Sequence, residues 1–147
     1  MNTKNKSLLK IAIAVFSLML FVISINGCGE KDEFGVGPVK DEMKLAPIDN
    51  NLVAKGKQIF DVKCVSCHKF DTRLVGPPLK DVTKRRRPEW IMNQILNPTE
   101  MTMKDPIAKQ LFAQYLVQMT FQDVTHDDAR AILEYFRAVD NNQITAQ

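Results

Sequence analysis

Apolar residues recur at helical spacing in four stretches of the chain. These stretches are residues 50–63, 87–96, 105–116 and 125–139. The last has the clearest apolar stripe, which consists of Ala129, Ile132, Leu133, Phe136 and Val139. Such a stripe is typical of an amphipathic helix packed against a core. Because no stretch shows the alternation typical of strands, the pattern predicts an all-α fold with four or five short helices.

Residue types that begin helices stand at the start of three of these stretches. Pro88 suits the first position of a helix, and Asp105, followed by a proline, is a typical N-cap. Thr125 with Asp128 three residues later forms a variant of the capping box. Between the first two stretches, "LVGPPLKD" at residues 74–81 predicts a loop stiffened by proline.

The N-terminus has a different pattern, in which lysines precede an uncharged run of about 15 residues from Ile11 to Ile25. This arrangement indicates a secretory signal peptide. The apolar run is shorter than the ~20 residues that a membrane-spanning helix usually needs. The next residues, "INGC" up to Cys28, resemble the lipobox of bacterial lipoproteins, which implies cleavage before Cys28 and lipidation of that residue. The alternative is a cysteine that follows an uncleaved anchor helix. Both predict an exported protein held at a membrane, facing the periplasm or the cell exterior.

The sequence thus predicts three parts: a lipoprotein signal peptide at 1–27, a flexible tether at 28–50 and one domain at 51–147. The tether is inferred from its mixed charge and its glycines and prolines. The formal net charge of +3 equals the number of lysines in the signal peptide. Since the remainder is balanced in charge, the composition gives no support to nucleic-acid binding.

The candidate chemistry lies in "CVSCH", which contains Cys64, Cys67 and His68. C-x-x-C-H is the attachment motif of c-type haem, in which the two thiols form thioethers with the haem and the imidazole binds the iron. A thioredoxin-like pair would need a βαβ setting, and a structural zinc site usually needs four ligands. A disulfide between the two cysteines would close too short a loop to stabilise the chain much. The motif therefore predicts one covalent haem c.

The residues around the motif extend this prediction. "GKQIF" before it, "VGPPL" after it, an isolated methionine and the final "ARAILEYFR" resemble class I cytochromes c, monohaem bacterial ones in particular. The resemblance spans about residues 52–139. It implies a helical fold around one haem, with the first and last helices in contact through Gly56 and Phe60. It also implies a hydrogen bond from the imidazole of His68 to the carbonyl of Pro77.

The sixth iron ligand has several candidates in the sequence. The downstream sulfurs belong to Met92, Met101, Met103 and Met119. Met92 lies in a predicted helix and is expected in the core, whereas Met101 and Met103 lie in a predicted loop. The resemblance favours Met119, which precedes the last helix, although Gln118 stands where many relatives have proline. His126 is expected to be a solvated residue in the first turn of the last helix.

Three further residues are candidates for haem binding. Arg86 and Arg87, in the run "KRRRP", are candidates for pairing with the haem propionates. The same run has two other interpretations, a docking patch for an acidic redox partner and a solvated helix start. Trp90 is a candidate for lining the haem pocket or binding a propionate, with plain core packing as the alternative.

These residues predict an electron carrier, not an enzyme. It would pass single electrons between respiratory-chain components or to a terminal reductase or oxidase, with the membrane and redox proteins as partners. A haem-based gas sensor is the main alternative, and a dedicated electron-entry subunit of one redox enzyme is another. The ligand on the distal face of the haem decides between carrier and sensor.

Overall fold

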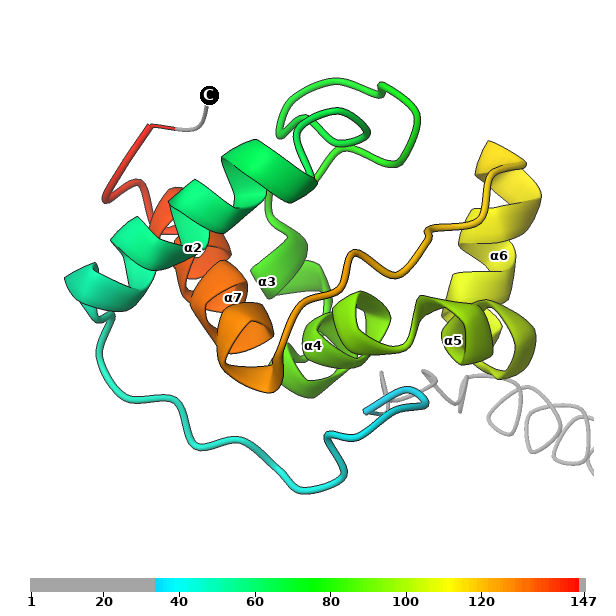
Figure 1. Ribbon diagram of the computed structural model, residues 1–147, viewed down its shortest axis with the longest axis horizontal. Helices are drawn as coiled ribbons and strands as arrows, with labels where there is room; N and C mark the ends of the chain where they lie inside the picture. Colours follow the sequence, from blue (N-terminus) through cyan, green and yellow to red (C-terminus); the bar gives the residue numbers. More distant parts are fainter. Residues whose placement is uncertain (1–33, 146–147) are drawn as a thin grey trace, which may run out of the picture. The chain divides into compact units, whose positions relative to one another are not determined.

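The structure, a computed structural model, describes residues 34–145 and contains six helices in that range (Figure 1). They are α2 (Asn50–Lys63), α3 (Val82–Arg85), α4 (Pro88–Leu96), α5 (Pro98–Lys104), α6 (Pro106–Tyr115) and α7 (His126–Asp140). No strand occurs in this range. The all-α prediction is therefore confirmed, with more helices than the four or five expected.

The three predicted helix starts are confirmed, two of them by capping contacts. The Asp105 side chain accepts a hydrogen bond from the amide of Ala108 at the start of α6. Thr125 and Asp128 form a complete capping box at the start of α7, and Pro88 is the first residue of α4. These contacts satisfy amide groups that the first helical turn leaves without partners.

Helix α5 occupies a segment that the sequence analysis predicts to be a loop. Pro98 supplies its first residue, where the missing N–H of proline costs nothing. Glu100 and Lys104 form an ion pair of 2.9 Å one turn apart. Met101 is fully buried, so packing of this one side chain adds to the local signals that make the short helix.

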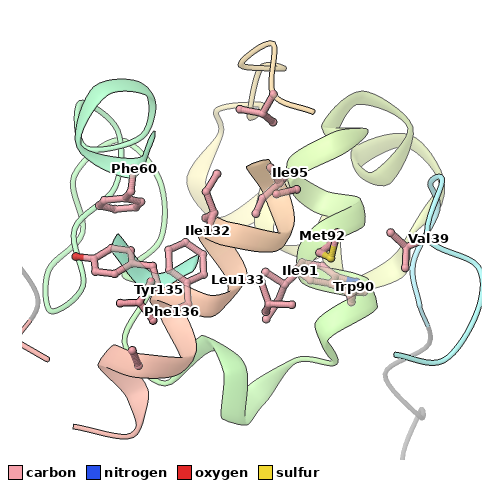
Figure 2. Close-up of a cluster of buried hydrophobic side chains, with 14 of the residues drawn as sticks. Val39, Phe60, Trp90, Ile91, Met92, Ile95, Ile132, Leu133, Tyr135 and Phe136 are labelled. Carbon is pink, nitrogen blue, oxygen red and sulfur yellow. The ribbon is translucent and has the colours of Figure 1, made fainter. Parts of the chain in front are cut away.

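The first and last helices of the described domain, α2 and α7, cross at Gly56. A Cβ atom on Gly56 would lie 2.0 Å from the carbonyl oxygen of Ala131 in α7, so the crossing requires glycine. One turn later the ring of Phe60 packs at 5.5 Å from Tyr135 and 5.7 Å from Phe136 (Figure 2). The expected helix contact is confirmed for Phe60, while Gly56 meets the backbone of α7.

Residues 34–49, which we call the strap, run along α4, α5 and α7 before α2 begins (Figure 1). The buried Asn93 of α4 accepts from the amide of Val39 at 2.9 Å and donates to the Val39 carbonyl at 2.8 Å. The buried Glu134 of α7 accepts from the amide of Asp49 at 2.9 Å. The prediction of a flexible tether is therefore wrong for residues 34–49, which pack as part of the domain.

The predicted signal peptide and the predicted lipidation site Cys28 lie outside the described residues. Within residues 34–145, no helix combines the length and the apolar character that crossing a membrane requires.

Candidate haem site

The C-x-x-C-H motif forms a tight turn directly after α2. The amide of Cys64 donates to the carbonyl of Phe60 at 2.9 Å and ends the helix. The amides of Cys67 and His68 then both donate to the carbonyl of Cys64, each at 3.0 Å. The turn therefore places all three motif side chains beside one cavity.

This cavity has a volume of about 360 Å³, within the range usual for ligand sites. Most of its wall is apolar. Its polar and charged positions include Lys63, Arg85, Arg86, Gln94 and Gln118. The wall comes from the end of α2, the loop at residues 75–79, helices α3 to α6, the segment before α7 and α7 itself. Lined by apolar groups and opening beside two thiols and an imidazole, the cavity suits a flat, largely apolar cofactor.

His68 is oriented by the loop that follows it. Its Nδ1 atom lies 3.1 Å from the carbonyl oxygen of Pro77. Because a carbonyl only accepts, Nδ1 carries the proton and donates, and Nε2 is left free to bind a metal. Burial lowers the pKa of His68, and the bond to Pro77 opposes that change. The hydrogen bond expected from the resemblance is thus present.

Gly76 is a site residue that the sequence analysis did not single out. A Cβ atom at this position would lie 2.4 Å from Cε1 of His68 and 2.9 Å from its Nδ1. The Gly76 amide also donates to the carbonyl of Cys67 at 2.9 Å. The backbone of Gly76 therefore lies directly against the imidazole, and "VGPPL" was the only sign of it in the sequence.

The two cysteines differ in their surroundings. Cys67 is exposed, whereas Cys64 is partly buried. Burial raises the pKa of the Cys64 thiol to about 11. The two cysteines do not form a disulfide with each other, and both side chains line the cavity, where thioether bonds to a haem would form.

Of the four candidate methionines, Met119 alone lines the cavity. Its sulfur lies 3.7 Å from Nε2 of Gln94 in α4. The sulfur of Met101 instead accepts from the amide of Val36 in the strap at 2.9 Å. Met103 is 65% exposed and Met92 is fully buried in the core, as expected for the latter. Met119 is thus the only one of the four candidates that lies in the cavity wall.

His126 does not take part in this wall. It is the first residue of α7, and its side chain is 61% exposed. This agrees with the expectation of a solvated residue in the first turn.

The arginine run divides between the cavity and the strap. Arg86 lines the cavity and lies over the ring of Trp90 at 5.4 Å, and Arg85, which the sequence analysis did not select, lines it too. Arg87 does not line it. Its guanidinium contacts Glu89 and Glu42, each at 3.2 Å. The expectation that Arg87 binds haem is therefore not supported, because its side chain contacts the strap.

Trp90 lines the cavity and is 4% exposed. Its indole Nε1 donates to Asp105 at 3.2 Å, the same carboxylate that caps α6. The indole N–H is thus engaged by the protein, which supports the lining role and not the propionate contact.

Comparison with known proteins gives one consistent answer. The family model for cytochrome c matches residues 53–140. A cytochrome c from Rhodothermus marinus is 47% identical, covering 73% of this chain and 92% of that chain with a TM-score of 0.70. An engineered cytochrome c from the same organism is 45% identical, covering 72% and 92%, with a TM-score of 0.69.

A more distant similarity extends to a second genus. The cytochrome c domain of a Pseudomonas putida protein is 28% identical, covering 58% of this chain and 88% of that chain with a TM-score of 0.51. No curated protein matches.

The matched range contains the whole cavity wall, from Phe60 to Phe136, and both cysteines. The wall fits haem, because it is mostly apolar, both cysteines and His68 line it, and Gly76 leaves no side chain between the loop and the imidazole. From these observations we conclude that the chain belongs to the cytochrome c family, holds haem c covalently through Cys64 and Cys67, and is an electron carrier rather than an enzyme.

Proposed function

We propose that this chain is a membrane-tethered monohaem cytochrome c whose iron is bound by His68 and Met119. It carries single electrons between respiratory-chain components or to a terminal reductase or oxidase. The observation that carries the proposal is the placement of Met119, the one candidate methionine on the cavity wall. His68 supports the other half, with Nε2 free and Nδ1 held by Pro77.

This ligand pair determines the chemistry. A thioether ligand raises the reduction potential relative to two imidazoles. Bound by both His68 and Met119, the iron would have no position open to a substrate or a gas, so the protein would support outer-sphere electron transfer. The protein's own contribution is to hold both ligands in place, His68 through Pro77 and Met119 through the segment before α7.

The propionate contacts belong to the same proposal. Arg85 and Arg86 line the cavity, and guanidinium groups match carboxylate geometry. The Arg85 side chain also donates to the carbonyl of Pro78 at 3.3 Å, which joins this part of the wall to the loop that orients His68. We assign these two arginines to the propionates in place of Arg87.

The axial ligand is tested by Met119→Ala with Met103→Ala as its matched control, since Met103 is 65% exposed and lies off the cavity wall. Met119→Ala is expected to lower the potential, abolish the sulfur-to-iron charge-transfer band of the oxidised protein and allow carbon monoxide to bind. Met103→Ala is expected to change none of these. An unaltered spectrum in Met119→Ala would remove Met119 as the ligand. Rapid carbon monoxide binding by the wild-type protein would favour the sensor.

The membrane part rests on the sequence, through Cys28 and the lipobox. Two lipid groups suffice for stable anchoring. Cys28→Ser is therefore expected to move the haem-loaded protein from the membrane fraction to the soluble fraction. Retention of Cys28→Ser in the membrane fraction would favour an uncleaved anchor helix. Crosslinking of the anchored protein in intact membranes is the direct way to find the redox partner.

A further inference from the structure

The segment that carries Met119 has few backbone contacts of its own. It runs from Leu116, which ends α6, to Thr125, which caps α7 (Figure 1). Within the described part of the chain, no backbone–backbone hydrogen bond involves residues 117–124. Leu116 is 78% exposed and Phe121 is 51% exposed, so apolar burial fixes this segment only in part. We call residues 117–124 the methionine segment.

Side chains from other elements fix the methionine segment instead. Lys63, the last residue of α2, donates from Nζ to the carbonyl of Gln122 at 2.8 Å and to the carbonyl of Asp123 at 3.0 Å. Gln118 donates to Oγ1 of Thr99 in α5 at 3.2 Å. The lysine contact has the greater strength, because a charged donor makes stronger hydrogen bonds than a neutral one.

The backbone that accepts from Lys63 has a specific conformation. Successive carbonyls of an extended chain point to opposite sides, so two adjacent carbonyls reach one ammonium group only where the chain turns. Asp123 supplies the turn with a φ of 51°, a conformation that aspartate adopts more readily than most residues. The backbone at residues 122–123 is therefore bent towards Lys63, and Val124, which is buried, follows directly.

We propose that Lys63 is a positioning residue that holds Met119 over the haem by binding the methionine segment. Lys63 directly precedes Cys64, so one end of α2 carries the haem attachment and also secures the segment with the distal ligand. Gln118 adds a second, weaker contact from the other side of Met119.

This inference rests on the proposed ligation by Met119. Its measurable consequence concerns how easily Met119 gives way to another ligand. Imidazole added to the oxidised protein must displace Met119 to bind iron. Loss of the Lys63 side chain frees the segment, so the affinity for imidazole should rise. A charged hydrogen bond that is partly exposed typically contributes ~1.4 kcal/mol, which corresponds to an increase in affinity of about tenfold.

The experiment compares four variants of the haem-loaded protein. Lys63→Met removes the donors while keeping an apolar chain, and Lys63→Arg keeps charge and donors. Asp123→Asn keeps the turn-forming type of residue but removes the carboxylate. Lys57→Met is the matched control, because Lys57 lies on the same helix but pairs with Asp61 at 2.6 Å. The readouts are imidazole affinity and the rate at which chymotrypsin cleaves the folded protein after Phe121, a half-exposed residue of the methionine segment.

The expected result is tighter imidazole binding and faster cleavage in Lys63→Met. Lys63→Arg should behave like the wild-type protein, and the two other variants should show neither effect. Unchanged imidazole affinity and an unchanged cleavage rate in Lys63→Met would overturn the proposal. The same effect in Asp123→Asn would also overturn it, since a carboxylate and not the carbonyls would then be the partner. If Lys63→Met fails to accumulate with haem, Lys63→Gln is measured against the same expectations.

The same data separate this inference from the function on which it rests. If the wild-type protein lacks the sulfur-to-iron band, the ligation by Met119 fails, while the rate of cleavage after Phe121 still reports whether Lys63 holds the segment. If the band is present and Lys63→Met changes neither readout, the ligation stands and the role of Lys63 is refuted.

Discussion

The crossing of α2 and α7 permits a sharp test of what holds the fold together, through Gly56→Ala. An alanine at this position places a Cβ atom 2.0 Å from the carbonyl oxygen of Ala131 and 2.5 Å from its carbonyl carbon. Ordinary van der Waals contact begins at 3.4 Å. Both atoms belong to the backbone of a regular helix, so no side-chain rotation relieves the clash and the two helices must separate by about 1 Å or more.

The magnitude follows from two opposing effects. Alanine favours a helix over glycine by about 1 kcal/mol, which would stabilise α2. Overpacking costs ~1–3 kcal/mol where side chains can adjust, and occasionally more. Here the neighbour is rigid, and separation of the helices also weakens the contacts of Phe60 with Tyr135 and Phe136, because a gap of 0.5–1 Å loses about a quarter to a half of a contact's attraction. We expect a net loss of about 3 kcal/mol in the free energy of unfolding.

The assay is thermal and denaturant unfolding of haem-loaded protein, followed by far-ultraviolet circular dichroism. A loss of about 3 kcal/mol corresponds to a fall in Tm of roughly 12 °C or more for a domain of this size. The matched control is Ala54→Gly at an exposed position of the same helix, which should lose only the helix preference of about 1 kcal/mol. A Gly56→Ala protein as stable as wild type would refute the close backbone contact.

Three further predictions test the site and the strap. Gly76→Ala should push the His68 ring, since the new Cβ lies 2.4 Å from Cε1, and the visible absorption spectrum should shift; an unaltered spectrum would contradict this contact. Asn93→Ala leaves the amide and carbonyl of buried Val39 without their side-chain partner, so the free energy of unfolding should fall by about 2–3 kcal/mol. Residues 34–48 should also be cleaved faster in limited proteolysis. Asn97→Ala, which removes a strap contact of 3.4 Å, should have a smaller effect. Lys55 and the Thr125 cap lower the pKa of Asp128 from 3.8 to about 2, so the stabilisation is complete above pH 4 and lost as the pH falls towards 2. Asp128→Asn should therefore be less stable than wild type at neutral pH by about 1 kcal/mol, after allowance for solvent screening. In denaturant titrations this difference should vanish near pH 2.

The helices that the sequence predicts well are those with strong local signals. Helix α7 combines an apolar stripe with a complete capping box, and α4 and α6 both begin at a proline. These signals depend on neighbouring residues, so they can be recognised without knowledge of the fold. Helix α5 was missed because its seven residues bury only Pro98 and Met101, too few to establish a period.

The strap shows what a local pattern cannot reveal. Its backbone is held by side chains distant in sequence, with Asn93 binding Val39 across 54 positions and Glu134 binding Asp49 across 85. A segment of glycine, proline and mixed charge has the composition of a tether whether or not such partners exist. The same limit applies to the arginine run, because the sequence does not tell which of Arg85, Arg86 and Arg87 points towards the cavity.

The haem site was predictable to the extent that its chemistry is local in sequence. The attachment motif places two thiols and an imidazole within five residues, and the loop with Pro77 follows closely enough to reach back to His68. The distal side depends on distant contacts, because Met119 comes to the wall through a segment held by Lys63, 59 positions before Gln122. Motif recognition therefore establishes what is bound, whereas the segment that carries Met119 is held by side chains that no motif contains.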